Sequence, residues 1–162
     1  MTKPRPRVVV DTCVVVDLLT NIDPSRARNS AYLLAGHNDR HDVILPAIVL
    51  AEIAGTGEIR GGHLTAALRD DRVNRALKWI SDSKFMVAEL SERLGREAAK
   101  LAVEHQLKGP DATVLATAVA WKCQKLYTRD HGILKCDGKF NGLKILEPES
   151  PPPPEPTLFP GL

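Results

Sequence analysis

The sequence is poor in the residues that several classes of protein require. Aromatic side chains make up 4% of the 162 residues, which disfavours recognition of nucleic acid by extended base stacking. The 3 cysteines, Cys13, Cys123 and Cys136, form no CxxC pair and are odd in number. They are therefore expected to be reduced thiols of a cytosolic protein and not parts of a disulfide framework.

Long apolar segments and glycine-rich turns are also missing. No apolar run approaches the roughly 18 to 20 residues of a membrane span. The basic start of the chain leads into an apolar run that Asp11 and Asp17 interrupt, which makes a poor secretory signal. No glycine-rich turn follows the first predicted strand, and this excludes a dinucleotide-binding fold. We expect a soluble, cytoplasmic protein without a membrane segment.

Size and composition predict one globular domain followed by a tail. A chain of 162 residues with 43% hydrophobic and 26% charged residues can bury a substantial core. Seven of its 12 prolines lie between Pro148 and Pro160. We therefore predict a domain over residues 1–147 and a Pro-rich, flexible tail over residues 148–162. The formal net charge is only +2, so a convergence of acidic residues would leave the remaining surface basic, which suits a polyanionic substrate.

Strand-like and helix-like segments alternate along the chain. Short apolar runs predict strands at 8–10, 43–45, 85–87, 125–128 and 143–146. Apolar residues at helical spacing predict helices at 12–19, 25–35, 47–54, 63–81, 91–106 and 111–122. This alternation is typical of an α/β fold, here a three-layer α/β/α domain with a mostly parallel central sheet.

Asp11 directly follows the run Val8-Val9-Val10, which predicts a strand buried on both faces. Open α/β sheets bind their ligands at the carboxyl ends of their strands, so Asp11 is a candidate site residue. An alternative is that Asp11 only caps the helix that follows, because Asp is a favoured N-cap residue.

Two further acidic residues lie on apolar helix faces. Glu52 is the only charged residue in segment 47–54, and Asp111 shares a helical stripe with Leu115 and Ala118. A buried carboxylate costs several kcal/mol unless a cation or hydrogen bonds compensate it. A structural arginine partner for Glu52 and a capping role for Asp111 are the simpler alternatives.

Asp130 follows the strand predicted at 125–128, as Asp11 follows the first strand. Two acidic residues at strand ends and two on flanking helices are expected to meet in one pocket. Four carboxylates cannot remain ionised together without cations between them. Hard oxygen ligands of this kind suit Mg²⁺ or Mn²⁺ and not Zn²⁺.

Together these segments resemble the PIN-domain ribonucleases, and in particular the VapC-type toxins of bacterial toxin–antitoxin pairs. The resemblance covers residues 7–147 and rests on four segments in this order: Val8-Val9-Val10-Asp11-Thr12, Ile48-Val49-Leu50-Ala51-Glu52, Pro110-Asp111-Ala112-Thr113-Val114-Leu115-Ala116-Thr117-Ala118 and Leu126-Tyr127-Thr128-Arg129-Asp130.

The resemblance implies a metal-dependent endoribonuclease in which Mg²⁺ or Mn²⁺ activates water for attack on an RNA phosphodiester, leaving a 5′-phosphate and a 3′-hydroxyl. It implies Asp11, Glu52, Asp111 and Asp130 as catalytic residues and metal ligands; we call these four residues the acidic set. Thr12 and Thr128 match hydroxyl positions that would orient carboxylates or water. The family also implies a homodimer and a cognate antitoxin whose C-terminal segment blocks the site.

Two departures from the family pattern affect the expected metal site. Cys13 stands where many relatives carry Ser or Asn, which removes a good oxygen ligand. The segment 131–134, His-Gly-Ile-Leu, lacks the further acidic residue that some members place after Asp130. We therefore expect a second metal ion to bind weakly, or only together with substrate.

Arg129 adjoins Asp130 and is the best candidate for an RNA contact, whereas Asp17 is expected to lie outside the catalytic set.

A phosphatase of the haloacid dehalogenase type is excluded, because Cys13 stands where that family requires a second Asp. A degenerate PIN-like domain that binds RNA or protein without cutting remains the alternative, and metal binding discriminates between the two.

Overall fold

The central sheet of the computed structural model, which describes residues 4–154, has five parallel strands in the order β3-β2-β1-β4-β5. The strands are β1 (Arg7–Val10), β2 (Asp42–Pro46), β3 (Met86–Ala88), β4 (Lys125–Tyr127) and β5 (Lys144–Leu146). Every pairing in the sheet is parallel. The predicted three-layer α/β/α fold is confirmed, and the sheet is parallel throughout.

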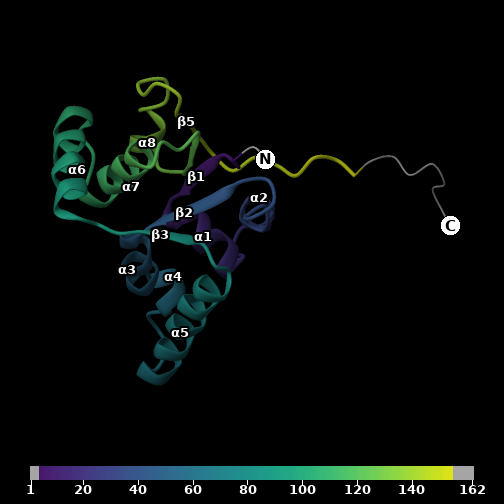
Figure 1. The fold of residues 1–162 in the computed structure, drawn as a ribbon. Coiled ribbons are helices and arrows are strands. Elements are labelled where there is room, and N and C mark those ends of the chain that lie inside the picture. Colours follow the sequence, from purple (N-terminus) through teal and green to yellow (C-terminus); the bar gives the residue numbers. More distant parts are fainter. Residues whose placement is uncertain (1–3, 155–162) are drawn as a thin grey trace, which may run out of the picture.

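Helices cover both faces of this sheet (Figure 1). On one face lie α1 (Thr12–Thr20) and α2 (Pro24–Ala35). The other face carries α7 (Gly109–Ala120) and α8 (His131–Leu134), with α6 (Glu92–His105) packed on α7. Three further helices, α3 (Ala47–Gly55), α4 (Gly57–Arg60) and α5 (Ala66–Asp82), form an arm below the sheet in the view of Figure 1.

Alternation along β1 explains why this strand is buried on both sides. Val8 and Val10 pack in the core cluster beneath α1 and α2, whereas Val9 packs in the cluster beneath α7 and α8. All three valines are at most 2% exposed. The strand therefore lies at the centre of the sheet. Asp11 follows its carboxyl end and lies between the two helical layers.

Two short helices were not expected from the sequence, and α7 begins earlier than predicted. The helices α4 and α8 are only four residues long, which is too short to produce an apolar period. Helix α7 begins at Gly109 because Pro110 fits the first turn, where its missing N–H has no intrahelical partner. Asp111 consequently lies in the first turn of α7 and is not its N-cap.

The beginning of the predicted flexible tail is attached to the domain. Pro148 is buried, and its carbonyl oxygen accepts a 3.4 Å hydrogen bond from Asn29 on α2. Glu149 pairs with Lys125 on β4 at 3.6 Å. Beyond these contacts the described segment leaves the domain (Figure 1), and residues 155–162 lie outside the described part of the chain.

None of the helices within residues 4–154 combines the length and apolar character that crossing a bilayer requires.

Candidate active site

Asp11 both caps α1 and faces the functional side of the sheet. Its Oδ1 accepts a 2.7 Å hydrogen bond from the backbone N–H of Thr12, as an N-cap does. Its Oδ2 accepts hydrogen bonds from Thr128 Oγ1 at 2.6 Å and from Cys13 Sγ at 3.6 Å. Burial raises the pKa of Asp11, which is 7% exposed, and the charge of Asp130 raises it further. The capping interpretation is therefore correct, but capping occupies only one of the two carboxylate oxygens.

Thr128 and Asp130 extend this arrangement from the adjacent strand β4. The Thr128 side chain is completely buried, and its Oγ1 accepts a 3.0 Å hydrogen bond from the backbone N–H of Asp130. Asp130 caps α8, because its Oδ1 accepts a 3.0 Å hydrogen bond from the backbone N–H of Ile133. One hydroxyl thus connects the two acidic residues that follow neighbouring strands.

Glu52 reaches the same region from α3. It lies beside the buried Ile53 but is itself only partly buried, which corrects the interpretation that its carboxylate is enclosed in the core. Thr12 Oγ1 donates a hydrogen bond to Glu52 Oε2. Within residues 4–154 no salt bridge involves Glu52, so the structural arginine partner considered from the sequence is not found. A partly exposed helix position explains how the carboxylate remains hydrated without a cation.

Asp111 enters from the first turn of α7 and is half-buried. Its pKa is raised from 3.8 to about 6, first by burial and then by the charges of Asp130, Asp11 and Glu52; Lys108 partly opposes this effect. Each of the three other members of the acidic set therefore repels the Asp111 carboxylate. This electrostatic coupling shows that the four carboxylates share one environment.

All four members of the acidic set line one open cavity of about 480 Å³ at the carboxyl edge of the sheet. Asp11 follows β1 and Asp130 follows β4, whereas Glu52 lies on α3 and Asp111 on α7, so four separate segments meet here, as expected from the sequence. The cavity also includes side chains from the chain segments around it: Thr12, Cys13, Val16, Asp17, Arg26, Thr56, Glu58 and Arg129.

Arg26 and Glu58 were not predicted from the sequence to lie at this cavity. Glu58 lies on α4, which is too short to show helical periodicity, and Arg26 is one of two exposed arginines on α2. Only the packing of α2 and α4 against α1 brings them to the acidic set.

The carboxylate and hydroxyl oxygens of the cavity are suitable ligands for a hard divalent cation, but they do not surround one common metal position. Carboxylate and hydroxyl oxygens are the ligands that Mg²⁺ and Mn²⁺ prefer. Among the described residues, no three His, Cys, Asp or Glu side chains are arranged to hold a metal ion. The protein itself occupies several carboxylate oxygens, through Thr12, Thr128 and the backbone of Ile133. A bound cation would have to compete with these hydrogen bonds, and in return it would relieve the repulsion that raises the pKa of Asp111.

Cys13 is a neutral donor in this site. Burial and the neighbouring Asp11 raise the pKa of its thiol to about 12. The Sγ atom also accepts a 3.3 Å hydrogen bond from the backbone N–H of Arg129. A thiol in this state is neither a nucleophile nor a ready metal ligand at neutral pH.

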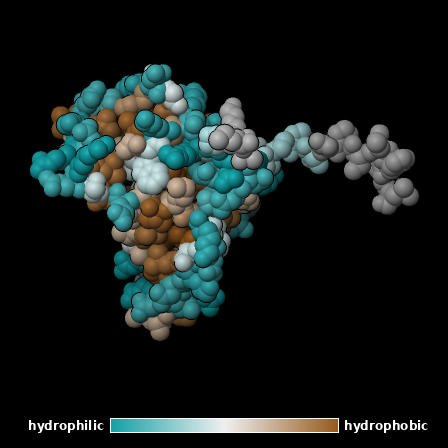
Figure 2. Space-filling view, in the orientation of Figure 1, coloured by the Kyte–Doolittle hydropathy of each residue, from teal (hydrophilic) through white to brown (hydrophobic). Residues whose placement is uncertain are grey.

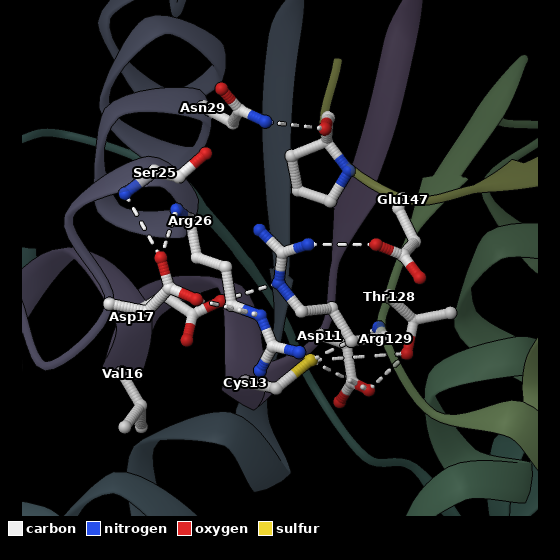
Figure 3. A network of polar contacts seen from close by, with 12 residues as sticks. Asp11, Cys13, Val16, Asp17, Ser25, Arg26, Asn29, Thr128, Arg129 and Glu147 are labelled. Atoms are coloured by element: carbon white, nitrogen blue, oxygen red, sulfur yellow. Dashed lines mark hydrogen bonds and ion pairs between the residues drawn. The ribbon is translucent and has the colours of Figure 1, made fainter. Parts of the chain in front are cut away.

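Arg129 is held inside the cavity wall by two carboxylates (Figure 3). Its Nε donates to Asp17 Oδ2 at 2.6 Å, and its Nη1 donates to Glu147 Oε2 at 2.9 Å. The side chain of Arg129 is 11% exposed and that of Asp17 is 19% exposed. The remaining nitrogen, Nη2, has no hydrogen-bond partner among the described residues, but it is buried. An RNA phosphate would have to displace a carboxylate or open the wall to reach Arg129, so the RNA contact predicted for Arg129 stays a prediction that the geometry does not favour. Asp17 contacts Arg129 and not the acidic set.

Comparisons with known protein families and solved structures agree with the fold described above. The sequence model of the PIN domain family matches residues 8–139 of this chain. A search among curated protein sequences finds no significant match.

Three solved structures of similar fold are 20–21% identical in sequence to this chain, and this level of identity shows the fold alone. VapC20 of Mycobacterium tuberculosis, a sarcin–ricin-loop-cleaving toxin, superposes with a TM-score of 0.64 at 21% identity over 85% of this chain and 98% of that one. FitAcB from Neisseria gonorrhoeae gives 0.62 at 20% identity, over 87% and 97% of the two chains. A toxin–antitoxin complex from Klebsiella pneumoniae gives 0.61 at 20% identity, over 88% and 98%.

Proposed function

The chain belongs to the PIN domain family, and from this premise we propose that it is a Mg²⁺- or Mn²⁺-dependent endoribonuclease that acts as the toxin of a toxin–antitoxin pair. PIN domains are generally nucleases. The observation that carries the proposal is the convergence of Asp11, Glu52, Asp111 and Asp130, from four separate segments, on one open cavity. Three carboxylates that together raise the pKa of a fourth, Asp111, form a site that is costly to maintain without a cation to bind.

In this proposal the acidic set would hold the cation, and the two hydroxyl residues would position the carboxylates. Bound there, a divalent cation lowers the pKa of water and neutralises charge on the phosphodiester. Thr128 fixes the rotamer of Asp11 through its 2.6 Å hydrogen bond, and Thr12 similarly holds Glu52. Cys13 keeps its proton and donates to Asp11, so it contributes orientation and no charge.

A non-catalytic PIN module that binds RNA or protein is the second candidate. It is favoured by one observation, the absence among the described residues of three side chains already arranged around a metal position. Titration with Mn²⁺ separates the two candidates, because a nuclease site must bind the ion and a degenerate module need not. Binding that is lost in Asp111→Asn supports the nuclease.

The decisive experiment is cleavage of mixed cellular RNA by the wild type and by Asp11→Asn, with Mg²⁺, with Mn²⁺ and with EDTA. We expect discrete, metal-dependent cuts with 5′-phosphate ends that the substitution abolishes. Asn retains the capping oxygen at the start of α1 but replaces the oxygen that accepts from Thr128, so thermal melting must show that the variant is folded. No cutting by antitoxin-free wild type across several RNA pools would favour the binding module.

The proposed partners are an RNA substrate, a cognate antitoxin and a second copy of the chain. We propose that the protein acts in the cytoplasm. A similar solved structure, the toxin–antitoxin complex from Klebsiella pneumoniae, supports the antitoxin as a partner. The homodimer is proposed from the family resemblance. A surface for the second copy is the apolar groove between α3, α5 and β3, where Figure 2 shows a brown patch. We call it the α3–α5 groove; it is lined by Leu50, Ala51, Leu77, Ile80, Ser81, Lys84, Phe85 and Val87.

A further inference from the structure

Two arginines line the acidic cavity, and they differ in burial and in the number and length of their ion pairs. Arg129 is 11% exposed and paired with two carboxylates at 2.6 and 2.9 Å. The side chain of Arg26 on α2 is 56% exposed. Within residues 4–154, its only ion pair is a 3.5 Å approach of Nε to Asp23 Oδ2. Within the same described residues, Nη2 of Arg129 also lacks a hydrogen-bond partner, but this nitrogen is buried. Arg26 is therefore the guanidinium of this cavity whose free donors are accessible to a ligand.

The partner of Arg26 is already engaged in capping α2. Asp23 Oδ1 accepts hydrogen bonds from the backbone N–H groups of Ser25 and Arg26 at 3.0 and 3.1 Å. The remaining 3.5 Å contact is longer than the about 2.7–2.9 Å of a strong charge-assisted hydrogen bond. An exposed pair of this kind contributes little, so a stronger anion can replace Asp23 at small cost.

Position and charge indicate which anion Arg26 would bind. Figure 3 shows its guanidinium pointing from α2 toward the side of the cavity where Asp11 and Cys13 lie. An RNA strand that enters a cavity lined by four carboxylates brings further phosphates beside the one that reacts. Those phosphates need a positive partner of their own, and the planar fork of Arg matches two phosphate oxygens.

We propose that Arg26 binds the RNA phosphate next to the scissile phosphodiester, while Arg129 fixes the wall of the cavity. This inference rests on the proposed nuclease function and deepens it, because it assigns backbone recognition to one residue of α2. It also divides the two arginines by role: Arg26 contacts substrate, and Arg129 positions the segment that carries Asp130.

The test compares RNA affinity across salt concentration in Arg26→Ala, Arg26→Lys and Arg28→Ala. Arg28 is a matched control, because it is also exposed on α2 but does not line the cavity. All proteins carry Asp11→Asn, so that a pool of fluorescein-labelled cellular RNA fragments is bound and not cut. Fluorescence anisotropy gives the dissociation constant at each KCl concentration, and thermal melting checks that each variant is folded.

We expect Arg26→Ala to weaken binding and to reduce the slope of log affinity against log salt by about 0.7–0.9, the effect of one phosphate contact. Arg26→Lys should keep the slope but not the full affinity, because it keeps the charge and loses the fork. Arg28→Ala should behave as the parent protein. An unchanged slope and affinity in a folded Arg26→Ala variant would overturn the proposal, as would equal losses in Arg26→Ala and Arg28→Ala.

Failure of this inference can be told apart from failure of the nuclease function. The binding experiment requires no cleavage, and the nuclease function is judged separately by the cuts that protein with an intact Asp11 makes in Mg²⁺ or Mn²⁺. With intact Asp11, Arg26→Ala should raise KM with little change in kcat, because the contact holds substrate before and during the reaction.

Discussion

Thr128 Oγ1 donates a 2.6 Å hydrogen bond to Asp11 Oδ2, and this bond joins the ends of the neighbouring strands β4 and β1. The Asp11 carboxylate is 7% exposed and its pKa is raised by burial. The hydroxyl partly offsets this effect, because a hydrogen bond to the charged form stabilises it. A residue outside the acidic set thus helps to keep a buried carboxylate ionised.

Thr128→Val removes this hydroxyl at nearly constant volume. We expect the free energy of unfolding to fall by about 1–3 kcal/mol, since a buried acceptor loses its donor, and RNA cleavage to fall as well. Urea unfolding and the cleavage rate measure the two effects. The matched control is Thr117→Val, because Thr117 is equally buried and its hydroxyl donates within α7 to Thr113 O. Loss of cleavage in the control as well would contradict a specific role for Thr128.

The stability of the metal-free protein should depend on pH through Asp111. Its pKa of about 6 lies above the usual 3.8, so the folded protein binds this proton more tightly than the unfolded chain does. The stabilisation is complete below pH 3.8 and is lost as the pH rises to about 6. Mg²⁺ or Mn²⁺ should restore stability above that window, because it replaces the proton as the positive partner.

Melting temperature against pH, in EDTA and in Mn²⁺, measures this dependence. Asp111→Asn should flatten the curve between pH 3.8 and about 6 and reduce the effect of Mn²⁺. The exposed Asp70 on α5 supplies the control variant Asp70→Asn, which should keep both features of the wild type. An Asp111→Asn curve that matches the wild type would refute the electrostatic coupling.

Replacing Arg129 should act on stability before it acts on RNA affinity. Arg129→Met leaves Asp17 and Glu147 without their cation, and we expect a loss of about 2–4 kcal/mol, less than for a fully enclosed pair. Arg129→Lys keeps the charge but cannot reach both carboxylates with a planar fork. A double-mutant cycle with Asp17→Asn, followed by urea unfolding, isolates the pair. Unchanged stability with reduced RNA affinity would instead support the RNA contact predicted from the sequence.

Cys13→Ser should tighten binding of Mn²⁺. The raised pKa keeps the native thiol neutral, whereas a serine hydroxyl supplies the harder oxygen donor that Mn²⁺ prefers. Calorimetric titration measures the affinity. Cys123→Ser is the control, because Cys123 is 3% exposed and packs in the core away from the cavity. Equal or weaker Mn²⁺ binding by Cys13→Ser would show that this position does not limit the metal site.

The proposed homodimer should depend on the α3–α5 groove. Val87 on β3 is 41% exposed and lines this groove, and Val119 on α7 is 43% exposed outside it. We expect Val87→Lys to lower the mass measured by light scattering from dimer to monomer, because a charge would be buried at the interface. Val119→Lys should leave the mass unchanged. A dimer that persists in Val87→Lys would place the interface elsewhere.

The sequence alone determined the elements and where the acidic residues stand along them. The β-branched run Val8–Val10 specifies a strand buried on both faces, and Asp11 and Asp130 follow strands in both the sequence and the structure. These features are local, because side-chain period and capping preference are properties of a few neighbouring residues. They were sufficient to predict a parallel α/β fold and four acidic residues at one edge.

Only the tertiary structure decided the contacts around those acidic residues. Arg129 lies beside Asp130 in sequence, yet its partner Asp17 is 112 residues away, and pairing of β1 with β4 brings the two together. Glu52 lies on an apolar helix but remains partly exposed, because that face of α3 opens on the cavity. Arg26 enters the cavity only through the packing of α2. Such contacts join distant segments, so no periodicity within any one of them encodes the result.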